Sequence, residues 1–224
     1  MSKRQWAISM NPWINNVTYG NPVDEFLPYL KNGAYQSVYE NLKDYHFSPN
    51  DSEATQDELR ELIAYQNTPE QQDEKLLGRY IAYNDDLVGI FKKYATEKIG
   101  VNLDKEIDEL NEDSKFLLLK LKFHYQRPRP YQVAQYYKAK LFPYKSITAI
   151  SPSYPSGHSF QARLFTELIG NKYPEHYEFL KNLTHDIMIS RMFLGLHFPS
   201  DNDFGVFCAK AIAQSKEFTT KYGL

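Results

Sequence analysis

Apolar residues recur along most of this chain at the three- and four-residue spacing of one helix face. From Leu103 the spacing holds through Ile107, Leu110, Leu117 and Leu121, until the prolines of "QRPRP" stop it. Further helices are predicted at 51–66, at 69–98 with a break near Gly89, at about 156–169, at about 174–195 and at 199–218. Strand-like alternation is sparse, so the pattern predicts an all-α fold.

Length, composition and charge narrow the range of functions. The chain has 224 residues, which suits one domain, 1–224, with a full hydrophobic core. The formal net charge of −2 gives no electrostatic reason to expect nucleic acid or an anionic membrane as a partner. Every apolar run is far shorter than a membrane-spanning helix requires, so no transmembrane segment is expected.

Two features bear on the cellular compartment. The basic start, "MSKRQWAISMNPW", has no apolar block behind it and is not typical of a secretory signal. Cys208 is the single cysteine, so no internal disulfide can form, which fits a reducing compartment. We therefore expect a cytoplasmic protein in which Cys208 is a small buried side chain.

The segment "KLKFHYQRPRP" carries the first of three polar clusters. Lys120 and Arg127 are seven residues apart, which is two helical turns, so both cations lie on one helix face. Pro128 ends the helix and places Arg127 at its C-terminal edge. Taken alone, the pair fits a solvated helix face better than a binding site.

The segment "SYPSGHSFQARLF" carries the second cluster, at the start of a helix. Ser156 and Gly157 form a turn whose free backbone N–H groups point toward whatever lies above the helix start. Gly157 lets an oxyanion approach the backbone closely, and His158 stands beside it, placed to give or take a proton. A capped helix with an unrelated histidine explains this segment at least as well.

The segment "SRMFLGLHFPSD" carries the third cluster, in the joint between two helices. His197 lies just before Pro199, which suits the first position of a new helix. Asp201 can accept one imidazole N–H and leave the other ring nitrogen with a free lone pair. Such a histidine is a nucleophile, a general base or a metal ligand. Arg191 can offer a bidentate fork to phosphate oxygens.

Together the clusters supply three fixed cations, a helix N-terminus, two histidines and one aspartate. A single carboxylate is too few ligands for Mg²⁺, and the cations would repel zinc. The combination therefore favours a site that binds a tetrahedral oxyanion such as phosphate without a metal and that can also transfer protons.

The three clusters resemble the signature of the type 2 phosphatidic acid phosphatase (PAP2) superfamily, which is Lys-x6-Arg-Pro, Pro-Ser-Gly-His and Ser-Arg-x5-His-x3-Asp. The superfamily includes bacterial class A non-specific acid phosphatases, integral-membrane lipid phosphatases and vanadium-dependent haloperoxidases. The residues that match are Lys120, Arg127, Pro128, Pro155, Ser156, Gly157, His158, Ser190, Arg191, His197 and Asp201. So many specified positions make a chance match negligible. The resemblance implies an all-α, single-domain helical bundle of the PAP2 type.

The resemblance also implies a mechanism and a set of site residues. His197 would attack phosphorus and form a phosphohistidine, with Asp201 holding it oriented and basic. His158 would protonate the leaving oxygen and then activate water. The groups implied to bind the phosphoryl oxygens are Lys120, Arg127, Ser156, the backbone N–H of Gly157, and Arg191. No cofactor is implied, and vanadate is expected as a phosphate-mimicking inhibitor.

Among the branches, the soluble acid phosphatases are most similar in size and in the stretches "SYPSGH" and "RPRPY". We therefore expect a metal-independent, soluble, acid phosphatase-like hydrolase that acts on a small phosphorylated substrate. The open alternatives are a phosphotransferase or diphosphate hydrolase with the same residues, a haloperoxidase with vanadate as cofactor, and an idle phosphate-binding module. The oligomeric state is also open, with a homo-oligomer among the alternatives.

Three other places near the motifs receive structural predictions. Arg129 is expected to support the site from behind or to lie in solvent. The "NDD" of 84–86 is expected to be a solvated helical turn rather than a metal site, and Tyr154 is expected at the site mouth.

Overall fold

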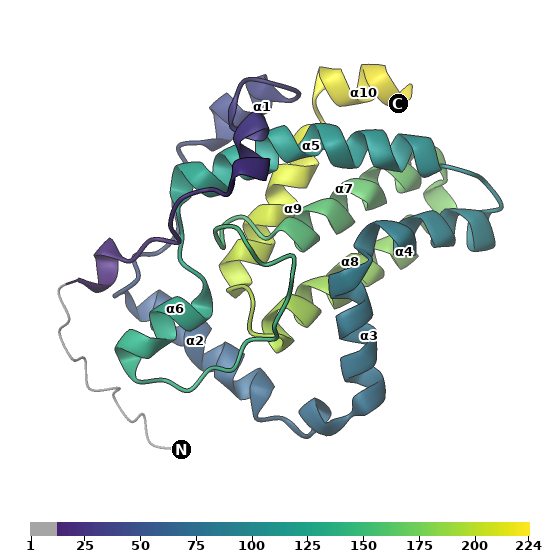
Figure 1. Cartoon of the computed structure of the whole chain (residues 1–224). Coiled ribbons are helices and arrows are strands. Elements are labelled where there is room, and N and C mark those ends of the chain that lie inside the picture. Colours follow the sequence, from purple (N-terminus) through teal and green to yellow (C-terminus); the bar gives the residue numbers. More distant parts are fainter. Residues whose placement is uncertain (1–12) are drawn as a thin grey trace.

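The computed structural model describes residues 13–224, which form helices joined by loops with no strand among them (Figure 1). The all-α prediction is confirmed over this range. Residues 1–12, which make up nearly all of the basic start, lie outside the described residues. The helices in chain order are η1 (Ile14–Asn16), η2 (Asp24–Leu30), α1 (Gln36–Leu42), α2 (Glu53–Gln66), η3 (Pro69–Gln72), α3 (Glu74–Asp85), α4 (Leu87–Tyr94), the π-helical turn η4 (Ala95–Ile99), α5 (Asp104–Tyr125), α6 (Pro130–Ala134), η5 (Gln135–Tyr137), α7 (Gly157–Lys172), η6 (Pro174–His176), α8 (Tyr177–Phe193), α9 (Pro199–Ala213) and α10 (Lys216–Tyr222).

The predicted helices are interrupted at more places than expected, and two of these breaks show the physical reason. The break expected near Gly89 falls at Asp86, whose backbone leaves the helical region and whose side chain accepts a hydrogen bond from the N–H of Gly89. The last predicted helix is two helices, because Ser215 caps α10 by accepting from the N–H of Phe218. In both places a short polar side chain satisfies a free N–H and starts a new helix.

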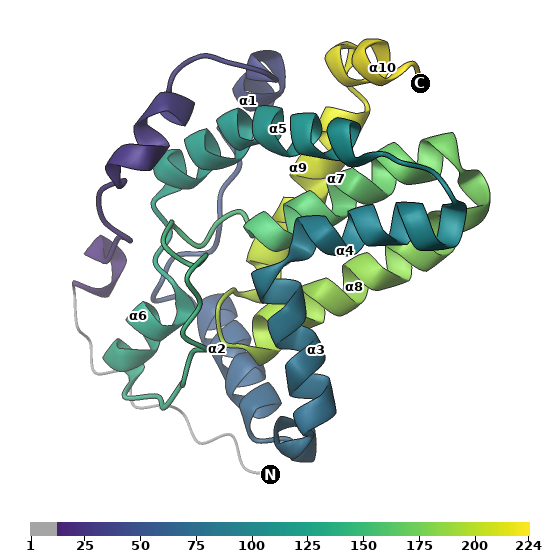
Figure 2. The ribbon, with the colours of Figure 1, turned by 45° about the vertical axis from the view of Figure 1, so that its right-hand side comes forward.

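Helix α7 is the centre of the molecule, and most of its residues are buried. It contacts α4, α5, α8 and α9, which surround it as Figure 2 shows. Helix α9 approaches its start so closely that a Cβ at Gly205 would lie 2.7 Å from the carbonyl oxygen of Ser156. Gly205 therefore allows the N-terminal turns of α7 and α9, which carry two of the three motifs, to meet.

Two groups of buried apolar side chains fix this arrangement. The larger group gathers residues from α1, α3 to α5 and α7 to α10, and it includes the fully buried Cys208, as predicted. The smaller group joins α2 and α6 to the α8–α9 joint, where Phe198 is fully buried next to His197. Burying a phenylalanine stabilises the fold by about 2–3 kcal/mol, so Phe198 anchors the joint that presents His197.

Candidate active site

The three segments that carry the polar clusters meet at a cavity of about 410 Å³. It lies where the start of α7, the C-terminal parts of α5 and α8, the α8–α9 joint and the α3–α4 joint come together. Its polar lining includes both motif histidines and four basic residues. The charged, histidine and glycine residues that line it are Glu25, Asp85, Asp86, Lys115, Lys122, Arg129, Gly157, His158, Arg191 and His197.

The geometry around His197 fixes its tautomer. Its Nε2 lies 2.8 Å from Nη1 of Arg129, and its Nδ1 lies 3.3 Å from Oδ2 of Asp201. A guanidinium can only donate, so Nε2 is the acceptor and Nδ1 carries the hydrogen that points to the carboxylate. Burial and the positive charge of Arg129 hold the pKa of His197 well below its usual value, which leaves the ring neutral at pH 7.

Asp201 is fully buried and held from several directions. Oδ2 also accepts from the N–H of Phe198 at 2.8 Å and from the hydroxyl of Ser153, while Oδ1 accepts from Nη1 of Arg127 at 2.6 Å. Burial alone would raise the pKa of Asp201, but the Arg127 charge and the hydrogen bonds from His197 and Ser153 hold that pKa well below its usual range. The carboxylate is therefore ionised and fixed behind His197.

His158 is held at the other side of the cavity, in the first turn of α7. Its Nε2 lies 3.0 Å from the backbone oxygen of Asn84, at the end of α3. A carbonyl only accepts, so Nε2 carries a hydrogen and Nδ1 is the nitrogen that gains or loses a proton. Burial and the nearby charge of Arg191 hold the pKa of His158 well below its usual value, although the bond to Asn84 opposes the shift.

Three basic side chains, each at most 3% exposed, surround the space between the histidines. Lys122 donates from Nζ to the carbonyl of Pro152 at 2.6 Å, which leaves two of its N–H donors for a ligand. Arg129 donates to the carbonyls of Ser151 and Leu196. Burial and the charge of Arg129 lower the pKa of Arg191 to about 9, so this guanidinium is still charged at pH 7. Its Nε has no hydrogen-bond partner within the described range.

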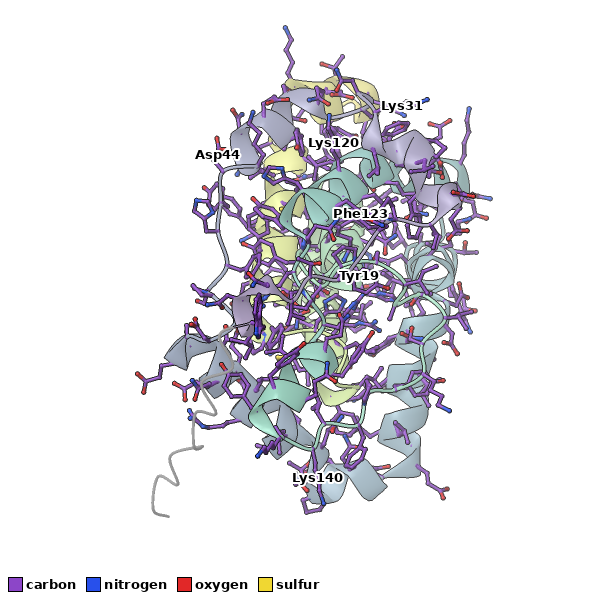
Figure 3. All side chains as sticks on the ribbon, turned by 60° about the vertical axis from the view of Figure 1, so that its left-hand side comes forward. Tyr19, Lys31, Asp44, Lys120, Phe123 and Lys140 are labelled. Carbon is purple, nitrogen blue, oxygen red and sulfur yellow. The ribbon has the colours of Figure 1, made fainter. Side chains whose placement is uncertain are left out.

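The resemblance implies phosphate binding by Lys120 and Arg127, but the structure places neither residue at the cavity. The Lys120 amine donates to the side chains of Asn32 and Gln36, each at 2.8 Å, on the far side of α5. Figure 3 shows it at the end of the molecule that carries Lys31. Arg127 is fully buried and paired with Glu58 and Asp201 behind the site.

The physical reason for this correction is a second copy of the same spacing. The stretch "KLKFHYQRPRP" contains Lys120-x6-Arg127-Pro128 and also Lys122-x6-Arg129-Pro130. Two residues turn an α-helix by about 200°, so the two lysines lie on opposite faces of α5. Arg129, expected to support the site from behind or to lie in solvent, is instead 1% exposed, lines the cavity and contacts His197.

A signal for the pair that lines the cavity was present in the sequence. Ser114, Leu118 and Lys122 follow one another at four-residue spacing, and the structure buries all three. Lys120 instead follows Phe116, which is only half-buried. The continuation of the buried stripe, rather than the spacing of charges, distinguishes Lys122 from Lys120.

The remaining predicted residues divide between the cavity and its support. Gly157 lines the cavity, whereas Ser156 is fully buried beneath it and donates its N–H to the carbonyl of Asp201 at 2.8 Å. Tyr154, expected at the site mouth, is instead buried and stacked on Phe204 with ring centroids 4.3 Å apart. Asn84, expected in a solvated turn, is 1% exposed and contacts both His158 and Arg191.

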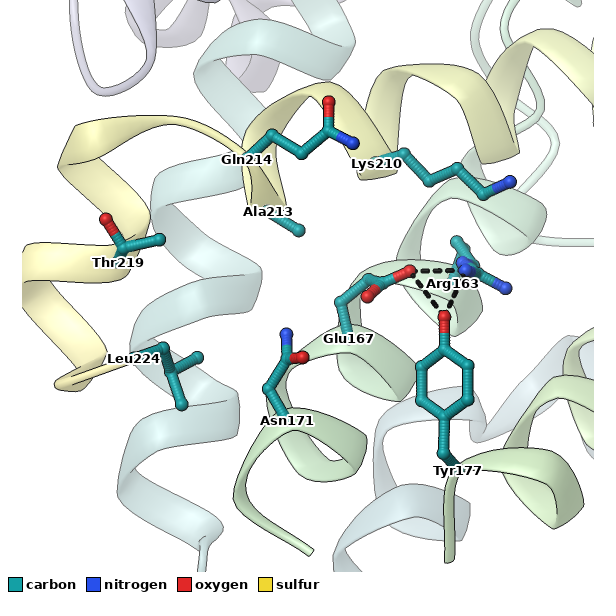
Figure 4. A pocket seen from close by; sticks show the side chains of 9 residues that line it. All are labelled: Arg163, Glu167, Asn171, Tyr177, Lys210, Ala213, Gln214, Thr219 and Leu224. Atoms are coloured by element: carbon teal, nitrogen blue, oxygen red, sulfur yellow. Dashed lines mark hydrogen bonds and ion pairs between the residues drawn. The ribbon is translucent and has the colours of Figure 1, made fainter. Parts of the chain in front are cut away.

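A second cavity, of about 590 Å³, opens elsewhere along α7 (Figure 4). Its lining consists of Arg163, Glu167, Asn171, Tyr177, Lys210, Ala213, Gln214, Thr219 and Leu224. Arg163 pairs with Glu167 and donates to the hydroxyl of Tyr177 at 2.6 Å. This lining has no histidine and none of the motif residues, so the smaller cavity is the candidate active site.

Residues 13–224 show neither a metal-binding cluster nor a membrane-spanning helix. No group of three or more His, Cys, Asp or Glu side chains in this range is placed to hold a metal ion. None of the helices in the range combines the length and apolar content needed to cross a bilayer.

Comparison with known proteins agrees with the three motifs. The model of the PAP2 superfamily matches residues 114–215, and no curated protein sequence gives a significant match. Among solved structures, the chain is similar to the first transmembrane PAP2 type phosphatidylglycerolphosphate phosphatase from Bacillus subtilis, with 18% identity, a TM-score of 0.50, and coverage of 88% of this chain and 92% of that chain. At this identity the likeness shows the fold, and the expected closeness to class A acid phosphatases stays a prediction. Residues 114–215, which contain all three motifs, therefore match the PAP2 superfamily.

Proposed function

We propose that this protein is a metal-independent phosphatase that hydrolyses phosphate monoesters through a phosphohistidine on His197. One observation carries the proposal: a neutral, oriented imidazole shares a cavity with three buried basic side chains. Neutral imidazole is a nucleophile, and fixed cations stabilise the charge on a transferring phosphoryl group. The superfamily match and the phosphatase fold of the structural relative support the same reaction class.

In the first step, Nε2 of His197 attacks phosphorus and the bond from phosphorus to the leaving oxygen breaks. Protonated His158 gives its Nδ1 proton to that oxygen, and Asp201 stabilises the positive charge that forms on His197. In the second step, neutral His158 takes a proton from water as the water oxygen bonds to phosphorus. The phosphorus–nitrogen bond then breaks, its electron pair returns to Nε2, and phosphate is released.

Arg129 contacts the attacking atom directly, because its Nη1 donates a hydrogen bond to Nε2 of His197. We infer that a bound phosphoryl group draws this donor onto one of its own oxygens and so frees the lone pair of His197. Lys122 and Arg191 would bind the other phosphoryl oxygens, together with the backbone N–H of Gly157.

The cavity also has an apolar part that bears on the leaving group. Its apolar lining consists of Phe26, Leu87, Val88, Leu118, Leu119, Ile147 and Ile150. Burying apolar surface is favourable, so we propose that a leaving group with an aromatic or aliphatic body is preferred over a small polar one. Higher kcat/KM for p-nitrophenyl phosphate alone would not show this, because nitrophenolate is also a better leaving group. The useful comparison is hexyl phosphate with glycerol 1-phosphate, which are both primary alkyl esters.

The deciding experiment is hydrolysis of p-nitrophenyl phosphate in excess EDTA, with and without vanadate, by wild type and by His197→Ala. His124→Ala is the matched control, since His124 is exposed on α5 and does not line the cavity. We expect turnover that survives EDTA, falls with vanadate and vanishes only in His197→Ala. Quenched wild-type reactions with ³²P-labelled substrate should yield an acid-labile phosphoprotein that His197→Ala does not form.

Other outcomes would favour the alternatives. Cleavage of diphosphates with little monoester hydrolysis would make the protein a diphosphate hydrolase, and transfer of phosphate to an added alcohol would make it a phosphotransferase. Vanadate-dependent oxidation of bromide by peroxide would indicate a haloperoxidase. Phosphate binding with no turnover of any ester would leave an idle binding module.

A further inference from the structure

Asn84 lies outside the three motifs and outside the segment that matches the superfamily. It is the second-last residue of α3 and is 1% exposed. Both its side chain and its backbone contact residues of the candidate active site. Through these contacts Asn84 can position active-site residues, a role that none of the three motifs indicates.

The side chain of Asn84 holds Arg191. Its Oδ1 accepts from Nη1 of Arg191 at 2.8 Å and from the hydroxyl of Ser146 at 2.8 Å, and its Nδ2 donates to Oδ1 of Asp85 at 2.8 Å. A guanidinium and a carboxylate together fix which end of the amide is the oxygen, because one can only donate and the other only accept. The orientation of Arg191 in the cavity therefore depends on this amide.

The backbone of Asn84 holds His158 by a different route. The last four carbonyls of a helix lack partners within it, and the Asn84 carbonyl at the end of α3 is one of them. It accepts the hydrogen on Nε2 of His158, with 3.0 Å between that nitrogen and the carbonyl oxygen. Nδ1 is therefore the ring nitrogen that can give or take a proton. One residue thus positions a cation by its side chain and an acid–base group by its main chain.

We propose that Asn84 is a positioning residue, which aims Arg191 at the phosphoryl group through its side chain and fixes the tautomer of His158 through its carbonyl. The role rests on the proposed function. The two contacts are separable by mutation, because a side-chain substitution removes the contact to Arg191 and leaves the carbonyl of residue 84 in place.

The test is a double-mutant cycle between Asn84→Ala and Arg191→Ala, read out as the affinity for inorganic phosphate by titration calorimetry. In the wild-type background, Asn84→Ala should weaken phosphate binding by about tenfold, as expected for the loss of a hydrogen bond that orients a charged group. In the Arg191→Ala background, the same substitution should change the affinity by less than about twofold. The alkaline limb of the pH profile of kcat/KM should not move in Asn84→Ala, because the backbone contact to His158 remains.

Two further variants make the result specific. Ser146→Ala removes the other donor to the same Asn84 oxygen and should leave phosphate affinity within about twofold of wild type. Asn84→Leu, which matches the shape of asparagine without an acceptor, should repeat the effect of Asn84→Ala and serves if the alanine variant does not fold. Thermal unfolding reports whether each variant is folded.

The outcomes distinguish a failure of the positioning role of Asn84 from a failure of the proposed phosphatase function. An equal loss of phosphate affinity in both Arg191 backgrounds would overturn the role of Asn84, because the side chain would then act on the fold and not on Arg191. Wild-type protein that binds no phosphate would overturn the proposed function and this role with it.

Discussion

Two pairs of basic residues with the same spacing, Lys120 with Arg127 and Lys122 with Arg129, occupy different surroundings in this protein. The second pair is buried around the candidate active site, with Arg129 2.8 Å from Nε2 of His197. In the first pair, Lys120 contacts neutral amides at the surface, while Arg127 is buried in ion pairs with Glu58 and Asp201.

The difference between the pairs shows that spacing identifies a helix face only after the register is known. What separates the two buried arginines is their partners. Arg127 faces two carboxylates, so its charge is already compensated within the protein. Arg129 donates to carbonyls and to a histidine lone pair, and its charge lowers the pKa values of Lys122 and Arg191, so an added anion would compensate its charge.

Replacing each arginine by glutamine should change a different property of the protein, activity for Arg129 and stability for Arg127. These are the largest effects we expect. Arg129→Gln should lower kcat/KM for p-nitrophenyl phosphate by about 10²–10³-fold, because a donor to the transferring phosphoryl group is lost. Arg127→Gln should lower the free energy of unfolding by about 3 kcal/mol, because it leaves the buried Asp201 carboxylate uncompensated. Steady-state kinetics and urea unfolding of both variants measure the two effects.

The stability of Arg129→Gln is the control for this pair. Removing Arg129 relieves its repulsion of Lys122 and Arg191. The free energy of unfolding should therefore fall less in Arg129→Gln than in Arg127→Gln. Equal stability losses and equal activity losses in the two variants would contradict the division between a phosphate-facing and a structural arginine.

The pH dependence of activity should follow from the cations that face the histidines. The mechanism needs neutral His197 and protonated His158 in the free enzyme, and both pKa values are held below the usual value of about 6.5. The optimum of kcat/KM should therefore lie below pH 6.5, and above it the rate should fall toward tenfold per pH unit as His158 loses its proton.

Bound substrate should shift the pH profile of activity. A bound phosphate dianion compensates Arg191, Arg129 and Lys122, so it should raise the pKa of His158 and move the alkaline limb of kcat to higher pH than that of kcat/KM. Profiles of the two parameters between pH 4 and 9 check this. A rate that rises monotonically through pH 9 would contradict the roles of both histidines.

Much of the fold could be predicted from the sequence, because local patterns determine it. The apolar stripe of α5 and the starts of α7 and α9 follow from helical spacing and from prolines and glycines at helix ends. The motif residues His158, Arg191, His197 and Asp201 are brought together as the resemblance implied. The first fifty residues gave no such pattern, and their short helices η1, η2 and α1 were not predicted.

The parts that could not be predicted depend on contacts between distant segments. Glu58 and Asn84 reach the site from α2 and α3, and their chemistry is set by the residues they meet after folding. Nothing local distinguishes Asn84 from a solvated residue in "NDD". The choice between Lys120 and Lys122 also required knowing which face of α5 is buried.

The most direct test of the corrected assignment is the affinity for inorganic phosphate of Lys122→Met and Lys120→Met, measured by calorimetry beside wild type. Each substitution removes one amine from α5, and the two positions lie on opposite faces of the helix. We predict that Lys122→Met weakens phosphate binding by about 10–100-fold, as for the loss of a charge-assisted hydrogen bond, while Lys120→Met stays within about twofold of wild type. Weaker binding in Lys120→Met with wild-type affinity in Lys122→Met would contradict the assignment.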